Sequence, residues 1–309
     1  MYAKYVYNAS SDKDNILADI LALLTGETNK ANLSADCNQT GTEIVATVAA
    51  GWTLHDASAG TSKKAIKAAV YDDATTYKNV VLDASAAGYL KTVVYETWNE
   101  VSHSGTNKCY DSDSSTYSQR IDVSGGGTLY VFSSERFLVL ASQTAAGWAN
   151  SSYSGPTGCL ERSRDLPFDT VAAGWPNWFH AQFGRADYNA SYFGNAPRRM
   201  KKDETTVTGG SANYYVRTVG WDNLWTVSPS GIDQKIPDGT GGFLVPFYPG
   251  YCIQTYDMPA PYGEFSSLCD VWRIPSNIAS HLDTITKNGV DYLVLKLYGA
   301  NEMMVIRKE

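Results

Sequence analysis

The sequence contains few of the residues on which most catalytic and metal-binding sites depend. Histidine occurs only four times among the 309 residues. Neither a GxSxG nucleophile motif nor a cofactor-binding motif is present. We therefore expect no catalytic residues, no bound metal and no cofactor. The four histidines are His55, His103, His180 and His281.

Cysteine and long apolar runs are also scarce. The cysteines are odd in number and form no CxxC pair, which favours buried thiols over a disulfide framework or a zinc site. They are Cys37, Cys109, Cys159, Cys252 and Cys269. No apolar run approaches the ~20 residues of a membrane span, and residues 1–5 lack the features of a signal peptide. We expect a chain made and kept in a reducing, cytosol-like compartment, without membrane insertion.

Positive charge is too sparse for nucleic-acid binding. The chain has 25 Lys and Arg residues against 32 Asp and Glu residues, a formal net charge of -7. Binding to a phosphate backbone requires cations clustered on one face. One basic cluster, at residues 198–202, is followed directly by Asp203 and Glu204, which favours a solvated loop over a polyanion site. We expect no nucleic-acid partner.

Aromatic residues, in contrast, are abundant. The 21 tyrosines and eight tryptophans, with 43% hydrophobic and 18% charged residues, indicate a globular, mainly β chain. The length suffices for two domains with separate cores. The Pro-flanked stretch at residues 156–167 favours a boundary there. We expect an N-terminal β-rich domain at 1–160 and a C-terminal β domain at 161–309.

One amphipathic helix is predicted at residues 12–25. Ser11 can accept hydrogen bonds from the first free amides, and Asp12 and Asp14 suit the positive end of the helix. Gly26 can take the left-handed conformation that ends a helix. Apolar residues recur at helical spacing, so this helix is expected to pack on a sheet. They are Ile16, Leu17, Ile20, Leu21, Leu23 and Leu24.

Short strand patterns separated by turn residues make up most of the remaining sequence. We expect strands at residues 2–7, 43–48, 64–71, 80–83 and 89–98, and a hairpin at 128–141 connected by 133–136. Near the end, Asn288 and Gly289 favour a tight turn between strands at 283–286 and 291–298, with a third strand at 303–307. The predicted fold consists of antiparallel β-sandwich or meander domains, and the C-terminal domain ends in a three-stranded meander.

The tetrapeptide Ala-Ala-Gly-Trp occurs three times, ending at Trp52, Trp148 and Trp175. The spacing is irregular and the flanking sequences differ, which excludes an array with a fixed period. Small residues and Gly permit a sharp turn, and the Trp ring can then cover the end of a sheet. The pattern favours a packed turn over a ligand-stacking platform, so all three indoles are expected to be mostly buried.

Aromatic side chains also cluster just after residue 174. Trp175, Trp178 and Phe179 are candidate interface or ligand-facing residues, with His180 and Phe183 beside them. Aromatic faces can line a sugar-binding groove. Poor alternation and Pro176 favour a core or interface role instead.

Two pairs of short patterns contain residue types found in hydrolases. His55-Asp56 and Ser102-His103-Ser104 include a nucleophile and a base, but a triad is defined by its geometry, and sequence neighbours rarely face one another. Glu96 and Glu100 lie four positions apart at the end of an expected strand and resemble the paired carboxylates of glycosidases. Glycosidases of that kind use a helix-rich barrel, so we expect this chain not to be an enzyme.

Residues 111–115 resemble the first half of a calcium-binding loop. Thr116 stands where such a loop requires Gly, and Asp122 stands where it requires Glu. The pattern is therefore a weak indication of a metal site.

Five stretches near the two ends of the chain carry a family resemblance. They are YAKYVYN at 2–8, LTGET at 24–28, SGGGTLYVF at 124–132, LVPFYP at 244–249 and DVWRIP at 270–275. With these stretches the chain resembles uncharacterised virion proteins of tailed bacteriophages. The resemblance does not extend to the middle of the chain, and it transfers no catalytic residue.

The resemblance implies a structural protein of the virion, in the tail or baseplate, the neck, or the capsid exterior, and it favours the tail or baseplate over the capsid. Such a protein is assembled in the host cytoplasm and contacts other virion proteins and copies of itself, as a symmetric oligomer. The alternative is a receptor-binding, glycan-binding or glycan-degrading tail protein, which requires a groove where carboxylates and aromatic rings converge. That alternative would add a host surface glycan as partner.

Overall fold

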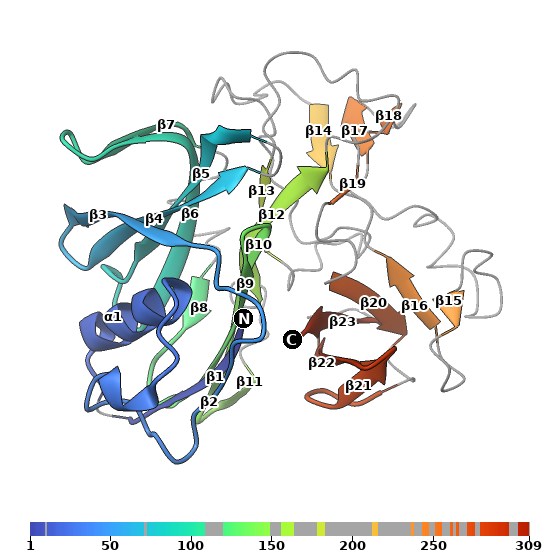
Figure 1. Ribbon diagram of the computed structural model, residues 1–309, viewed down its shortest axis with the longest axis horizontal. Helices are drawn as coiled ribbons and strands as arrows, with labels where there is room; N and C mark the ends of the chain where they lie inside the picture. Colours follow the sequence, from blue (N-terminus) through green and yellow to red (C-terminus); the bar gives the residue numbers. More distant parts are fainter. Residues whose placement is uncertain are drawn as a thin grey trace.

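The computed structural model is a mainly β fold with one α-helix (Figure 1). The described residues are 1–9, 11–70, 73–108, 120–148, 156–163, 279–296 and 302–308, with short strands between 178 and 275. The sheets are antiparallel. The predicted fold class, antiparallel β structure with an N-terminal helix packed on a sheet, is confirmed.

The first sheet has eight strands, and the first strand of the chain lies one position in from the edge strand β2. Its order is β13-β12-β10-β9-β1-β2, with β11 beside β10 and β19 beside β12. The strands are β1 Tyr2–Tyr7, β2 Glu43–Val45, β9 Gly127–Ser134, β10 Phe137–Thr144, β11 Gly147–Trp148, β12 Thr157–Ser163, β13 Trp178–Gln182 and β19 Glu264–Phe265. The sheet therefore includes strands on both sides of residue 160, and the division into domains 1–160 and 161–309 stays a prediction.

The second sheet is a meander in chain order. It runs β3-β4-β5-β6-β7, and β8 pairs with β6. The strands are β3 Thr53–Gly60, β4 Lys63–Val70, β5 Asp73–Asp83, β6 Tyr89–Asn99, β7 Ser104–Lys108 and β8 Arg120–Asp122. Figure 1 shows the connection between β6 and β7 projecting at the edge of the molecule.

One hydrophobic core joins the helix to both of these sheets. Helix α1 (Lys13–Leu24) contributes Ile16, Leu17 and Ile20, all at most 2% exposed. The same core includes Tyr5 of β1 and Val80 of β5. The helix thus covers the space between the two sheets, and burial of these side chains is worth roughly 1.5–3 kcal/mol each.

The ends of helix α1 correct one prediction and confirm another. The N-cap is Asp12, not Ser11: Asp12 Oδ1 accepts from Asp14 N at 2.7 Å, while Ser11 N donates to the carbonyl of Asn8. A carboxylate at Asp12 meets the first free amides directly. At the other end Gly26 has φ +103° and ends the helix as expected. A short 3-10 helix follows at Lys30–Asn32.

The C-terminal half contains two further sheets. A six-stranded sheet runs β15-β16-β20-β23-β22-β21, and a three-stranded sheet runs β14-β17-β18. The strands are β14 Ala212–Tyr215, β15 Ile236–Pro237, β16 Phe243–Pro246, β17 Tyr251–Gln254, β18 Ala260–Pro261, β20 Val271–Pro275, β21 Thr284–Lys287, β22 Val290–Lys296 and β23 Glu302–Arg307. The predicted meander is confirmed as β21, β22 and β23, and Asn288 and Gly289 both have positive φ in the turn.

Several strands differ from their predicted extents or were not predicted. β3 was not predicted, because its sequence TLHDASAG is poor in β-branched and aromatic residues. β5 starts at Asp73 rather than residue 80, and β2 ends at Val45 rather than residue 48. In these cases pairing with a neighbouring strand, not local propensity, determines where the strand begins or ends.

Trp52 confirms the packed-turn interpretation of its tetrapeptide. Its side chain is 3% exposed and belongs to the main core. The preceding Gly51 has φ +83°, and a Cβ there would lie 2.0 Å from the backbone nitrogen of Glu135. The turn therefore requires glycine at residue 51 for two reasons: its backbone conformation and its close contact with the β9–β10 turn.

Trp148 is of intermediate exposure, so its side chain is mostly but not fully buried, in agreement with the same prediction. It packs on His281 with ring centroids 4.1 Å apart, and its Nε1 donates to the carbonyl of Lys296 at 2.9 Å. Burial, aided by the charge of Lys296, lowers the pKa of His281 to about 4, so the imidazole is neutral at pH 7. Trp148 therefore joins the first sheet to the C-terminal sheet. Trp175 lies outside the described residues.

The two tetrapeptides give a matched test of the close contact at Gly51. Gly147 also has positive φ, +120°, but no atom lies within 4 Å of a Cβ built there. We expect Gly51→Ala to lower the free energy of unfolding by about 1–3 kcal/mol more than Gly147→Ala, because only the first substitution forces backbone atoms apart. Urea unfolding of both variants measures this difference. Equal losses of unfolding free energy would show that the positive φ, and not the close contact, is what requires glycine at residue 51.

Candidate functional site

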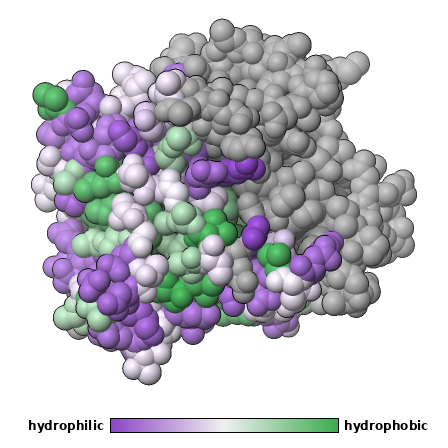
Figure 2. All heavy atoms as spheres, viewed as in Figure 1, coloured by the Kyte–Doolittle hydropathy of each residue, from purple (hydrophilic) through white to green (hydrophobic). Residues whose placement is uncertain are grey.

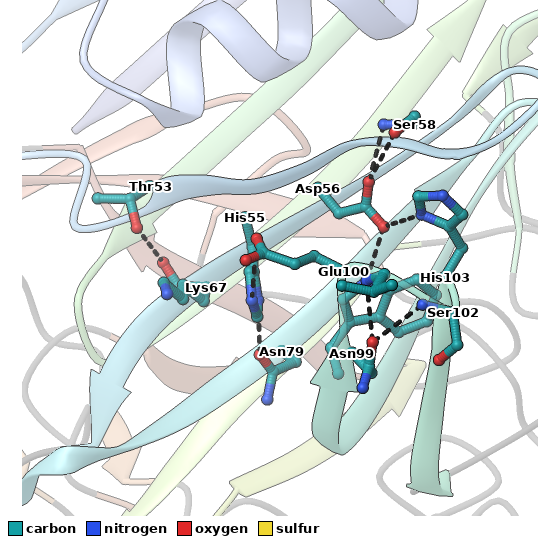
Figure 3. A network of polar contacts seen from close by, with 12 residues as sticks. Thr53, His55, Asp56, Ser58, Lys67, Asn79, Asn99, Glu100, Ser102 and His103 are labelled. Atoms are coloured by element: carbon teal, nitrogen blue, oxygen red, sulfur yellow. Dashed lines mark hydrogen bonds and ion pairs between the residues drawn. The ribbon is translucent and has the colours of Figure 1, made fainter.

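A network of polar side chains connects strand β3 to the β6–β7 hairpin (Figure 3). It is centred on Asp56, whose side chain is 2% exposed. Asp56 lies where the pairing of β3 with β4 shifts register, between Leu54 and Asp56. Such a bulge changes the direction of the side chains beside it, and here His55 and Asp56 contact different partners.

The Asp56 carboxylate accepts hydrogen bonds from three residues. Oδ2 accepts from Trp98 Nε1 at 3.0 Å and lies 2.8 Å from His103 Nδ1. Oδ1 accepts from the backbone nitrogen of Ser58 at 2.8 Å and from its hydroxyl at 3.2 Å. The buried carboxylate therefore has donors on both oxygens, as a buried charge requires.

These donors determine the protonation state of Asp56. Burial alone would raise the pKa of the carboxyl, but hydrogen bonds from His103, Trp98 and Ser58 outweigh burial and lower the pKa to about 2. Because Nδ1 of His103 faces an ionised carboxylate, the proton of the neutral imidazole belongs on Nδ1. Nε2 is then the basic atom, on a side chain that is 41% exposed.

Asp56 belongs to a recurrent Asp-x-Ser turn. In each of three copies, the aspartate Oδ1 accepts from the backbone nitrogen of the serine two residues later, at 2.8 or 2.9 Å. The copies are Asp56-Ala57-Ser58, Asp83-Ala84-Ser85 and Asp122-Val123-Ser124. This side-chain-to-backbone turn is typical of Asp. The repeated tripeptide is the sequence signal that would have identified Asp56 as structural.

The hairpin that carries His103 has an ordered and exposed tip. Asn99 Oδ1 accepts from the backbone nitrogens of Val101 and Ser102, both at 2.9 Å. His103 has φ +50°, which is uncommon outside glycine and is held here by the bond to Asp56. Val101, at the tip, is 85% exposed.

His55 takes a separate set of partners on the same strand. Its Nδ1 lies 3.2 Å from Asn79 Oδ1, and Asn79 Nδ2 donates to the carbonyl of Glu96 at 3.0 Å. The other ring nitrogen lies 4.0 Å from the Glu100 carboxylate, which is 63% exposed. An exposed ion pair at that distance contributes little.

Asp56 and His103 together form the carboxylate–imidazole pair that orients a general base in hydrolases. A nucleophile at Nε2 would be needed to complete a triad. The hydroxyls of Ser102 and Ser104 instead bond each other at 2.8 Å, and no hydrogen bond joins either of them to His103 in the described part of the chain. The pair can therefore accept a proton, but it lacks an aligned nucleophile among these residues.

The other predicted site residues are partly outside the described structure. Trp178 and Phe179 lie in β13, opposite Glu161 and Leu160 of β12. Trp175, the calcium-like residues 111–115 and the basic cluster 198–202 lie outside the described residues. Glu100 follows Asn99, the last residue of β6, so the strand alternation that was expected to pair it with Glu96 ends before it.

The structure describes the positions of some of the cysteines and of some of the residue types that bind metals. Cys37 and Cys159 are buried free thiols, as predicted, whereas the side chains of the other three cysteines are not described. Within the described residues no three His, Cys, Asp or Glu side chains gather as metal ligands would. The described part also has no helix with the length and apolarity to span a membrane.

Comparison with known proteins adds no relative. No protein-family model matches the chain, and a search of curated proteins also gave no match.

Replacing Asp56 tests the network through its pH dependence. We expect Asp56→Asn to lower the free energy of unfolding at pH 7 by about 1–2 kcal/mol. The amide cannot accept hydrogen bonds from all the donors that contact the carboxylate, and hydration of the groups left unpaired reduces the loss of stability. A carboxyl with a lowered pKa contributes stability above its unfolded pKa. The difference between the two proteins should thus shrink as the pH falls from about 4 towards about 2.

Asp122→Asn is the matched control for this variant. Asp122 forms the same turn, accepting from Ser124 N at 2.9 Å and from Ser124 Oγ, and no His or Trp of the described residues donates to it. Urea midpoints measured from pH 2 to pH 7 compare the two variants. An equal, pH-independent loss in both would contradict the assigned role of His103 and Trp98.

Proposed function

We propose that this chain is a structural component of a tailed-bacteriophage virion, in the tail, baseplate or neck, that acts through subunit–subunit contacts. Support comes first from the resemblance at residues 2–8, 24–28, 124–132, 244–249 and 270–275. In this proposal its partners are other virion proteins and further copies of itself, and it performs no catalysis. It is assembled in the host cytoplasm and remains in the particle.

The observation that carries the proposal is the apolar tip of the β6–β7 hairpin. Val101 is a large hydrophobic residue held at 85% exposure, on a turn fixed by Asn99 and by the Asp56–His103 bond. Figure 2 shows an isolated hydrophobic spot at the upper left extremity, where Figure 1 places this hairpin. An exposed apolar residue on an ordered projection is suited to insertion between neighbouring subunits.

The same sheet carries the other exposed large hydrophobics of the described residues. Leu54 of β3 is 46% exposed, and Tyr77 of β5 is 38% exposed. Among the described strands β3 is also an edge strand, and the outer backbone groups of an edge strand can pair with another chain. The sheet β3–β7 is therefore the part of the described structure best suited to a contact larger than ~1,000 Å².

Substitution at the hairpin tip tests the assembly role. We expect Val101→Asp to be incorporated into purified virions at least about tenfold less than wild type, because a charge would be buried at the contact. Its thermal stability should be unchanged, since Val101 makes little contact within the subunit. Quantitative mass spectrometry of gradient-purified particles measures incorporation.

Val101→Thr is the control, because it retains the shape of the side chain with one hydroxyl. It should be incorporated nearly as well as wild type. Absence of the wild-type chain from purified particles would overturn the proposal. Normal incorporation of Val101→Asp would show that the hairpin is not part of the interface.

The glycan-degrading alternative gives a different result in a direct assay. The structural proposal predicts that purified protein leaves host surface polysaccharide at its original length. Glu100 is the first carboxylate to test, because it is exposed and 4.0 Å from His55. Shortened polysaccharide with wild type, but not with Glu100→Gln, would establish the enzyme in place of the structural component.

A further inference from the structure

The contact between β11 and the C-terminal sheet is built around one imidazole ring. Trp148 of β11 lies against His281, with ring centroids 4.1 Å apart, and its Nε1 donates to the carbonyl of Lys296 at 2.9 Å. The indole also packs edge-on against Tyr130 of β9, with centroids 6.0 Å apart. We call the group of Trp148, His281 and Lys296 the joint.

The joint connects two parts of the molecule that have separate cores. Ile285, Val294 and Val305 belong to a core within β21, β22 and β23, distinct from the core around helix α1. Trp148 comes from the first sheet, whereas Lys296 is the last residue of β22. A change at the joint therefore acts on a contact between sheets and leaves both cores intact.

The hydrogen bonds of the joint require a neutral His281 ring. The backbone nitrogen of Lys296 donates to His281 Nδ1 at 3.2 Å. Because a backbone N–H can only donate, Nδ1 accepts, and the network assigns the ring proton to Nε2. Nε2 is buried and has no hydrogen-bond partner. A second proton, on Nδ1, would place two donors face to face and put a positive charge on a buried ring.

The groups around the ring supply no counter-charge among the described residues. The charged group that acts on it is Lys296 of β22. Asp283, the nearest acid in the sequence, accepts instead from the backbone nitrogen of Ser280 at 2.7 Å. From the first sheet come the uncharged Trp148 and, behind it, Tyr130, whose pKa is raised to about 12 by burial.

These surroundings determine when the ring becomes charged. Burial, with the charge of Lys296 acting in the same direction, lowers the pKa of His281 from 6.5 to about 4. The backbone of Val294 acts in the opposite direction and is outweighed. A histidine with a lowered pKa stabilises its contact fully above about pH 6.5, and this contribution is lost as the pH falls from about 6.5 to about 4.

We propose that the joint is an acid-sensitive switch, in which protonation of His281 releases Trp148 from the C-terminal sheet and deprotonation restores the contact. In the released state the imidazolium is hydrated, and the N–H of Lys296 no longer faces a second donor. The switch lies in the contact between the first and C-terminal sheets. It does not rest on the virion role.

NMR spectroscopy of the full chain follows both rings between pH 7 and pH 4. We expect His281 to titrate with a pKa near 4. Protection of the Trp148 indole N–H from solvent exchange, corrected for the intrinsic effect of pH, should fall by about tenfold or more over the same range, since one unit of pKa corresponds to a tenfold change in an equilibrium. The indole of Trp52, in the main core, is the internal control and should stay protected.

Two variants separate protonation from the other properties of His281. His281→Phe retains a ring and His281→Asn retains a short side chain with an acceptor, and neither can gain a proton in this range. Protection of the Trp148 indole should be independent of pH in whichever of them folds. The same loss of protection in a folded variant as in wild type would contradict the proposal.

Trp148→Leu tests the effect of the indole on the ring. We expect the variant to raise the pKa of His281 towards 6.5, because removal of the indole admits water to the imidazole. A pKa lowered further by Trp148→Leu would show that the indole stabilises the imidazolium through a cation–π contact. That result would overturn the switch, as would a wild-type pKa of 6.5 or above, or an indole that stays protected while His281 titrates.

Discussion

Burial of β1 between β9 and β2 is the interaction on which the N-terminal half depends. One face of β1 contributes Ala3 and Tyr5 to the core shared with helix α1 and the second sheet. On the other face, Tyr2 packs against Phe132, with centroids 5.2 Å apart, and lies under Lys308. A single strand thus contacts structure on both of its faces.

Inside this arrangement, Asp19 connects three segments that are distant in sequence. It is 4% exposed on helix α1, and its carboxylate accepts from Tyr5 OH and from the backbone nitrogen and hydroxyl of Ser34, all at 2.7 Å. Burial, together with the hydrogen bond to Asp19, raises the pKa of Tyr5, so the phenol stays protonated as the donor. The helix is therefore oriented on β1 by hydrogen bonds as well as by apolar packing.

Local patterns predicted the elements whose signal is contained in a few consecutive residues. Helix α1, strand β1, and the Asn288-Gly289 turn belong to this group, because helical spacing, alternation and turn chemistry act over short distances. β3 was missed because Ala, Ser, Asp and Gly have little intrinsic strand preference, and only pairing with β4 makes this segment extended. Long-range pairing is not encoded in any single window of sequence.

The candidate site shows the same division between local and distant information. The Asp-x-Ser turn at Asp56 was visible in the sequence as a repeated tripeptide. Its bond to His103 was not visible, since the two residues are 47 positions apart and meet only after β3 to β6 have paired. The partners of Trp148 were not visible either, because His281 and the carbonyl of Lys296 come from the other end of the chain.

The ordered hairpin tip has an entropic consequence. Loops that are flexible before association lose conformational freedom when they bind, at a cost of about 0.5–1.5 kcal/mol for each side chain immobilised. Here Asn99 already fixes the turn, and the bond between His103 and Asp56 already fixes the strand that leaves it. A hairpin ordered in the free subunit would lose little further freedom on contact, so even a small apolar tip would retain most of its gross binding energy.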